Sequence, residues 1–297
     1  MDYNKQPLDY SDIIELLKNR GLLFANEQQA EKNLQNISYF RLANYMRPME
    51  KDKKLHLYKP NSYFENAIDL YFFDKKLRVL IFEAIQTFEI ALRSKFIHYA
   101  SLKYGPFWFT DESLSINSKL FQENLNHIKQ ELERTKEEFI QEHFKKYDTP
   151  NFPPAWKTLE VISFGTLSKM FCNFSDHKIK KIISKELGVP QHIFLESWVK
   201  STVALRNCLA HHARVWNRKF PQMPKLPTKM PSTWINDTNI PMMKLYPQLC
   251  LLMYIQNNIH PETDLKLKLK DLIREHKNID LNAMGFPSNW EGQPLWH

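Results

Sequence analysis

Apolar residues recur at helical spacing along most of the chain, and this pattern predicts a series of helices. The first covers residues 8–20 and ends at Gly21, and the second begins near Asn26 and is stopped by Pro48. The longest pattern runs from residue 61 to about 104, where Gly105 ends it. The spacing predicts further helices over residues 117–146, 155–174, 191–219, 242–258 and 264–277.

Three interruptions divide this pattern. A charged turn at 51–54 leads into a short extended segment over 55–59, prolines at 150, 153 and 154 form a rigid break, and five prolines between 221 and 241 mark an irregular arm. We therefore predict an all-α protein. Its expected parts are an N-terminal helical extension over 1–60, a helical core over 61–220, and a C-terminal part over 221–297 with the proline-rich arm and further helices.

Composition supports the helical prediction and argues against several other classes. The 297 residues include only 6 glycines, and none lies in a glycine-rich phosphate loop, which argues against a nucleotide-binding α/β fold. Cys172, Cys208 and Cys250 are far apart and suggest neither a zinc site nor a disulfide framework. No apolar run approaches the roughly 18–20 residues of a membrane span, and the polar first residues lack a signal core, so we expect a cytoplasmic protein.

The formal net charge of +8 and the pI of about 9.1 favour a polyanionic partner such as nucleic acid. Charge alone is equally compatible with an ordinary basic protein. The run His177-Lys178-Ile179-Lys180-Lys181 adds a local feature. The lysines of this run, Lys178, Lys180 and Lys181, are predicted either to follow a phosphate backbone or to form a solvated face.

The densest group of candidate side chains is Arg206-Asn207-Cys208-Leu209-Ala210-His211-His212. On a helix, Asn207 and His211 lie on one face, whereas Arg206 and His211 are about 140° apart. Spacing alone therefore does not superpose the arginine and the histidine. A leaning arginine, a distorted helix, or a partner from another helix or another copy of the chain are the alternatives.

The chemistry of these side chains suits cleavage of RNA without a metal. An imidazole exchanges protons near neutral pH, so His211 is a candidate acid or base at the attacking 2′-hydroxyl or the leaving oxygen. The planar guanidinium of Arg206 matches the charge that develops on the phosphorus oxygens. No cofactor and no metal ion is expected.

These residues lie in a stretch that resembles a known family. The R-x(4)-H spacing of Arg206 and His211 is similar to the R-x(4–6)-H motif of HEPN domains, helical bundles that often act as metal-independent RNases. The run RNCLAHHARVWNR resembles a block of the Abi-type (abortive-infection) bacteriophage-resistance proteins. Three other blocks support the resemblance in the family's order: ISYFRLANYMRP at 37–48, FGTLSKM at 164–170 and MGFPSNWEGQPLW at 284–296.

The resemblance implies a HEPN-like helical core and an RNase toxin of phage defence. Arg206 and His211 then correspond to the catalytic pair and Asn207 to the polar residue that usually follows the arginine, while His212 offers a second spacing. The family also implies a homodimer with a shared cleft, and control by a small structured RNA. We predict that Arg214 and Arg218, from the same block, contact RNA.

The long helix over 61–104 repeats the arginine–histidine spacing with Arg93 and His98. One hypothesis is a second half-site, although Ser94 stands where the motif has its polar residue. A second is that Glu89 or Arg93 orients the main site from a neighbouring helix. The simplest interpretation is an ordinary ion pair between Glu89 and Arg93, four residues apart on a solvated face.

The simplest alternative to cleavage is that Arg206 and the two histidines only satisfy a buried polar network. Two functional alternatives and one hypothesis about the N-terminus also remain at this stage. The first is a non-catalytic RNA-binding module of a defence or toxin–antitoxin ribonucleoprotein, in which the basic residues only contact phosphates. The second is a metal hydrolase using His98, His211 and His212, although no strong ligand spacing is present. The third concerns the two N-terminal helices, which are compatible with a helix-turn-helix DNA reader but fit better as an extension packed on the core.

Overall fold

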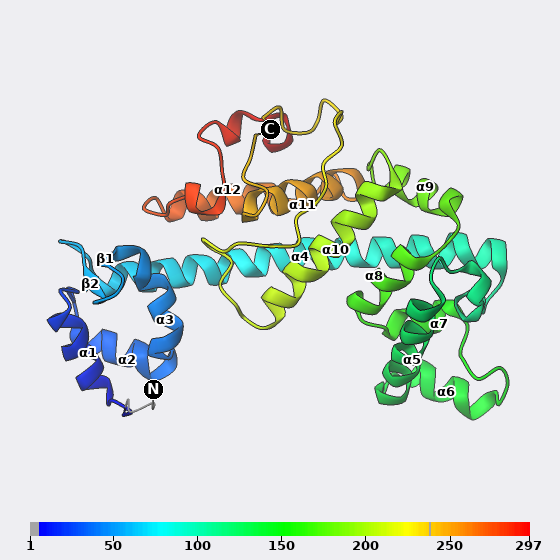
Figure 1. Ribbon diagram of the computed structural model, residues 1–297, viewed down its shortest axis with the longest axis horizontal. Coiled ribbons are helices and arrows are strands. Elements are labelled where there is room, and N and C mark those ends of the chain that lie inside the picture. Colours follow the sequence, from blue (N-terminus) through cyan, green and yellow to red (C-terminus); the bar gives the residue numbers. More distant parts are fainter. Residues whose placement is uncertain (1–5, 238) are drawn as a thin grey trace. The chain divides into compact units, whose positions relative to one another are not determined.

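The computed structural model describes residues 6–237 and 239–297, and it confirms the all-α prediction (Figure 1). The only strands within these residues form a small antiparallel hairpin, β1 (Glu50–Asp52) and β2 (Leu57–Tyr58). The described α-helices are α1 (Tyr10–Asn19), α2 (Glu27–Asn36), α3 (Tyr39–Met46), α4 (Phe64–Tyr104), α5 (Ser118–Arg134), α6 (Glu138–Lys146), α7 (Ala155–Val161), α8 (Phe164–Asn173), α9 (His177–Glu186), α10 (His192–Ala210), α11 (Leu245–Ile259) and α12 (Leu265–Glu275).

Two predicted helices are each split by a serine, so the sequence prediction is wrong at these points. The segment from 26 to 47 divides into α2 and α3 at Ser38, and the segment 155–174 divides into α7 and α8 at Ser163. Each serine hydroxyl accepts a hydrogen bond from the N–H three residues later. This N-cap geometry requires a non-helical backbone at the serine, so the preceding helix has to end there.

The predicted helix over 117–146 also divides, into α5 and α6, because residues 135–137 leave the helical path. The predicted helix over 191–219 stops at Ala210. The helices predicted over 61–104, 242–258 and 264–277 are confirmed as α4, α11 and α12, with boundaries that differ by a few residues.

The chain forms two compact units, with boundaries inside α4, inside α12 and just after α12. Unit 1 consists of the described part of Met1–Leu77 together with Asp271–Ile279. It contains α1, α2, α3 and the hairpin, packed around Leu17, Leu34 and Leu42. The hydroxyl of Tyr45 donates to Asp74 at 2.8 Å, which fixes α3 on the first turns of α4.

Unit 2 consists of Arg78–Lys270 and Asp280–His297. Its part of α4 carries Phe88, Leu92 and Phe96 into the core, where the ring of Phe96 contacts Trp108, Phe171 and Phe174. Helix α11 is buried over most of its length. The block at 284–296 covers it with an aromatic cluster, in which the indole of Trp296 donates to the Tyr246 hydroxyl at 3.0 Å.

None of the described helices combines the length and apolar character that a membrane span requires.

Candidate functional site

Helix α10 carries the Arg206–His211 block and is anchored in the core of unit 2. It packs against α8, α9 and α11, and its buried side includes Leu205 and Leu209. Near its beginning, Trp198 stacks on Trp234 with ring centroids 5.7 Å apart and donates its indole N–H to the Lys225 carbonyl at 2.7 Å. The helix therefore presents the block from a fixed base.

The last turn of α10 is regular up to His211. The N–H of His211 donates to the Asn207 carbonyl at 3.2 Å, as in an undistorted helix. The backbone therefore follows the α-helical path as far as the His211 N–H, and positions 206 and 211 keep the angular separation expected from the sequence. The His211 side chain is exposed, whereas the Arg206 side chain is half-buried.

His212 ends the helix by adopting a left-handed backbone conformation, with φ 53°. Its N–H donates to the Leu209 carbonyl at 2.8 Å, and the N–H of Ala213 donates to the Cys208 carbonyl at 3.0 Å. These two bonds define a Schellman motif, in which the left-handed position is usually glycine. The prediction of a helix toward 219 is wrong because this motif satisfies the last carbonyls and reverses the chain. No proline or glycine in the sequence marks this helix end.

Arg206 faces an ion pair on α4. The Arg93 guanidinium donates to the Glu89 carboxylate at 2.6 Å, and both side chains are mostly buried, with 11% and 18% of their surface exposed. Burial raises the pKa of Glu89, and the positive charges of Arg93 and Arg206 partly offset this rise. The structure thus brings Glu89, Arg93 and Arg206 into one electrostatic cluster that joins α4 to α10.

Arg93 also closes the end of a third helix. Its guanidinium donates to the carbonyls of Ile162 at 3.0 Å and Glu160 at 3.4 Å, which lie at the end of α7. Carbonyls at a helix end lack partners within the helix, and a guanidinium satisfies them well. The sequence did not reveal these contacts because residues 155–174 were expected to form one helix. The N-cap residue Ser163 was the signal that marked the break.

His98 lies in a different environment from Arg93. It is exposed on α4, and its ring contacts that of Tyr99. Hydrogen bonds from Lys95 and Tyr99 lower the pKa of Glu186 on α9, and the nearby His98 adds a smaller contribution. Arg93 instead contacts the end of α7. The structure therefore brings Arg93 together with Glu89 and Arg206, and it leaves His98 in a separate environment beside Tyr99.

The remaining residues of the block surround the end of α10. Asn207 is exposed, and Arg214 is half-buried with its guanidinium carbon 6.0 Å from the ring centroid of Trp216. The Trp216 indole N–H donates to the Asp280 carbonyl at 3.1 Å, so the segment after the helix is tied to unit 2. Arg218 is exposed.

The three predicted lysines of α9 do not share one environment. Lys178 and Lys181 are exposed, but Lys180 is fully buried. The Lys180 ammonium donates to the Glu196 carboxylate at 2.9 Å and to the Cys172 carbonyl at 3.0 Å. The prediction that Lys180 contacts RNA is therefore corrected: this lysine joins α8, α9 and α10 from inside.

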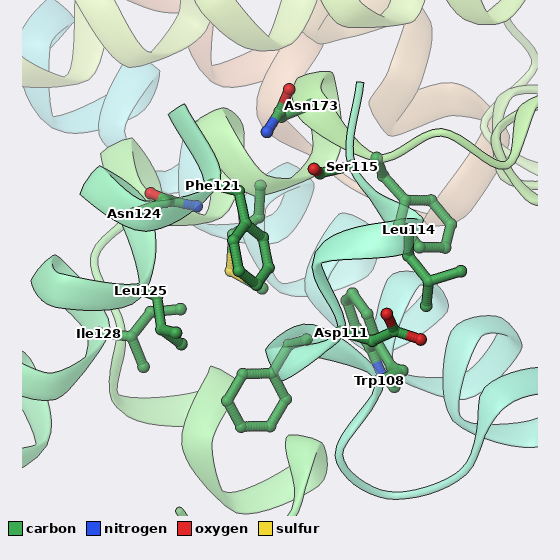
Figure 2. Close-up of a pocket in the computed structure, with 12 residues that line it drawn as sticks. Trp108, Asp111, Leu114, Ser115, Phe121, Asn124, Leu125, Ile128 and Asn173 are labelled. Carbon is green, nitrogen blue, oxygen red and sulfur yellow. The ribbon is translucent and has the colours of Figure 1, made fainter. Parts of the chain in front are cut away.

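An apolar hollow of about 360 Å³, partly open to solvent, lies between α5, α8 and the segment around Trp108 (Figure 2). Figure 2 shows Phe121, Leu125 and Ile128 among its lining side chains. Asn124 also lines it, and its side-chain oxygen is buried without a hydrogen-bond partner. None of the predicted site residues lines this hollow, so it is separate from the end of α10.

A second, polar hollow of about 670 Å³, also open to solvent, lies between α4 and the residues that follow α11, including Glu83, His260 and Glu262. It too is separate from the predicted site residues. Among the described residues, no three His, Cys, Asp or Glu side chains are grouped so that they could hold a metal ion.

Fold and site together define a class of all-α protein with a basic, histidine-bearing helix end set beside an Arg–Glu pair. The chain belongs to the Abi-like protein family, whose sequence profile matches residues 32–217, well over half of the 297 residues. This family is linked to abortive-infection resistance to bacteriophages. Comparisons with curated proteins and with solved structures gave no match.

The matched range contains three of the four blocks on which the resemblance was based. It begins in α2, includes the blocks at 37–48 and 164–170, and ends at Asn217, the second-last residue of the block that starts at Arg206. The block at 284–296 lies outside the range and forms part of the aromatic cover of α11. The family profile therefore covers both the α3 region of unit 1 and the candidate site of unit 2.

Proposed function

We propose that this chain is a metal-independent endoribonuclease of the HEPN type that acts as an effector in abortive-infection phage defence. The proposal rests on the arrangement of side chains at the end of α10. There an exposed imidazole, His211, lies just over one turn from an arginine, Arg206, which is held beside a mostly buried Arg93–Glu89 pair. The family match supports the biological role.

The proposed reaction is an intramolecular transfer at phosphorus. The 2′-oxygen of the substrate attacks the adjacent phosphorus, the bond to the 5′-oxygen breaks, and a 2′,3′-cyclic phosphate forms. His211 accepts the proton of the 2′-hydroxyl or gives one to the leaving 5′-oxygen, and a second group or water performs the other transfer. Arg206 stabilises the negative charge on the non-bridging oxygens.

Glu89 has a positioning role in this proposal. Its carboxylate holds the Arg93 guanidinium at 2.6 Å and faces the charge of Arg206. Because Arg93 is also fixed by two α7 carbonyls, the carboxylate has a defined place from which to orient Arg206. We expect Glu89→Gln to lower kcat more than it raises KM, since the substitution removes charge but keeps the shape.

The test uses purified protein and a fluorescent single-stranded RNA in the presence of EDTA. We expect cleavage with 2′,3′-cyclic or 3′-phosphate ends, and a loss of about 10²–10⁴-fold in Arg206→Ala and His211→Ala with an unchanged circular dichroism spectrum. His260 offers a matched control, because it is an exposed histidine at the end of α11 as His211 is at the end of α10. Cleavage should survive His260→Ala.

Salt-sensitive RNA binding without any cleavage by the unaltered chain would instead favour the non-catalytic RNA-binding module.

We further propose that the active form is a homodimer in which one copy supplies Arg206 and the other supplies His211 to a shared cleft. The separation of the two side chains around α10 supports this arrangement. Mixing inactive Arg206→Ala protein with inactive His211→Ala protein should then restore cleavage, since a mixed dimer contains one complete site. A mixture that remains inactive although mixed dimers form, or a monomer that cleaves RNA, would contradict the shared cleft.

A further inference from the structure

The element order of unit 1 is that of a helix-turn-helix followed by a hairpin. Helices α2 and α3 are joined by two residues, and Figure 1 shows α3 running in a different direction from α2. The β1–β2 hairpin follows α3 almost directly. The link between α1 and α2 is tied to the chain after the hairpin, since Leu23 exchanges backbone hydrogen bonds of 2.8 Å with Ser62 and Phe64. This order of helices with a trailing hairpin is that of winged helix-turn-helix domains, in which the second helix of the pair enters a nucleic-acid groove.

Helix α3 has one buried face and one face of the kind that reads bases. Leu42, Tyr45 and Met46 are buried in unit 1. The opposite face carries exposed residues at the spacing of a single helical stripe. These residues are Phe40, Arg41, Asn44 and Arg47. Phe40 is 82% exposed, more than any other large apolar side chain described in the chain. Packing in the core of unit 1 therefore does not explain why an aromatic residue occupies this position.

The side chains of this stripe match the chemistry of base edges in a major groove. An arginine pairs with guanine, an asparagine pairs with adenine, and a phenylalanine contacts the methyl group of thymine. Phe40 and Arg41 occupy the second and third positions of α3, and the N-terminal residues of a recognition helix are those that reach base edges. The amide nitrogen of Asn44 donates to the Phe40 carbonyl at 3.3 Å, one turn before it on the same stripe.

The hairpin adds positive charge beside α3. Lys51, Lys53 and Lys54 are all exposed. The two acidic residues of the hairpin are engaged internally: the Asp52 carboxylate accepts the N–H groups of Lys54 and Leu55 at 2.8 and 3.0 Å, and Glu50 pairs with His56 at 3.0 Å. The outer side of the turn therefore presents mainly ammonium groups, which suit phosphates of the strand that flanks a groove.

We propose that the exposed face of α3 and the lysines of the β1–β2 turn form a binding surface for double-stranded DNA. The surface fits DNA because the major groove of B-form DNA admits a helix, whereas that of A-form RNA is too narrow. The surface belongs to unit 1 and shares no residue with the proposed ribonuclease site of unit 2. The proposal of DNA binding is therefore independent of the proposed RNA cleavage, and either can fail without the other.

The experiment measures fluorescence anisotropy of a labelled DNA duplex of mixed sequence with the full chain carrying His211→Ala. A duplex RNA of the same sequence is measured in parallel, at two salt concentrations. We expect DNA binding that weakens steeply with salt, as phosphate contacts require, and weaker binding of the RNA duplex. Arg41→Glu should weaken DNA binding at least tenfold, and Phe40→Ala should weaken it by a smaller factor.

Arg41→Glu is suited to this test because it does not threaten the helix. Residue 41 is the third position of α3 and Ser38 is its N-cap, so glutamate there completes a capping box. Arg134→Glu, an exposed charge reversal at the end of α5, and Leu102→Ala, at a residue 75% exposed on α4, are the matched controls. Both controls should bind DNA within twofold of the parent chain. Absent DNA binding, equal binding by Arg41→Glu, or tighter binding of the RNA duplex would overturn the proposal.

Discussion

Helices α9 and α10 follow one another in the chain and end in the same backbone motif, but they use different residues to form it. The left-handed residue that follows α9 is Gly188, with φ 75°, and the one that follows α10 is His212, with φ 53°. At both ends the left-handed residue donates to the third carbonyl before it, and the next residue donates to the carbonyl five positions before it. Glycine adopts this conformation without strain, whereas histidine does so at a cost.

The two helices also begin differently: a side chain caps the first residues of α9, and none caps those of α10. The Asp176 carboxylate caps α9 by accepting two backbone N–H groups, and it also binds Lys103 and Tyr104. Helix α10 begins at Gln191 without a side-chain cap. Helix α9 thus follows the local rules of a stable helix at both ends, while α10 departs from them at both ends, one of which carries the candidate site. Such departures are expected where residues are selected for function rather than stability.

The largest effect that this comparison predicts is at Lys180 of α9. Replacing Lys180 by methionine removes the cation that binds Glu196 at 2.9 Å and leaves a partly buried carboxylate unpaired. We expect the free energy of unfolding to fall by about 3 kcal/mol, measured by urea denaturation. Lys181→Met is the control, because Lys181 is exposed on the same helix and should change stability by less than about 0.5 kcal/mol. Equal stability of the two variants would remove the structural role assigned to Lys180.

Lys180 also shows where prediction from the sequence stops. Periodicity identified the helical class and most helices, because core positions repeat regularly along each helix. The run of lysines, however, predicts charge and not burial. Lys180 is enclosed because Glu196 on α10 and the Cys172 carbonyl on α8 converge on its ammonium.

The candidate site was predictable to a similar degree. The Arg206–His211 block stood out by its residue types, and the structure brings Glu89 near Arg206, as one of the predicted alternatives requires. The end of α10 could not be predicted, because a left-handed histidine gives no signal comparable to a glycine. The serines that split two predicted helices were visible in the sequence, but their N-cap geometry depends on packing that the pattern does not specify.

The second effect, at the end of α9, tests why glycine is required there. A Cβ atom added to Gly188 would lie 2.5 Å from the side chain of Asn258, in addition to the strain of the left-handed backbone. We expect Gly188→Ala to lower the free energy of unfolding by about 2–3 kcal/mol. Combining it with Asn258→Ala should recover the part due to the clash and leave the backbone part. A Gly188→Ala protein as stable as the parent chain would show that the two helix ends tolerate the same residues.

The third effect concerns the beginning of α9 and depends on pH. Burial alone would raise the pKa of Asp176, but hydrogen bonds from Lys103, Tyr104 and two backbone N–H groups lower it to about 2. A depressed carboxyl pKa stabilises the fold above the ordinary value near 4, and this contribution is lost as pH falls toward 2. Asp176→Asn should therefore cost about 2 kcal/mol at pH 7, and less as the pH falls below 4.

This pH dependence has a direct control in Asp271→Asn. Asp271 is 65% exposed and pairs with Arg274 at 3.3 Å on the surface of α12. Its replacement should change stability little at any pH. A difference between Asp176→Asn and the parent chain that stays constant from pH 7 to pH 3 would mean that the Asp176 charge does not stabilise the start of α9.

The smallest effect, at the end of α10, separates the two adjacent histidines. Glycine at position 212 removes the strain of the left-handed conformation, so His212→Gly should raise the free energy of unfolding by about 1 kcal/mol, whereas His212→Ala keeps that strain and should give no gain. If His211 is the catalytic histidine, the glycine variant should also retain RNA cleavage. A loss of cleavage in His212→Gly as large as that in His211→Ala would assign the proton transfer to His212. The strained conformation would then be the means by which α10 presents its catalytic imidazole.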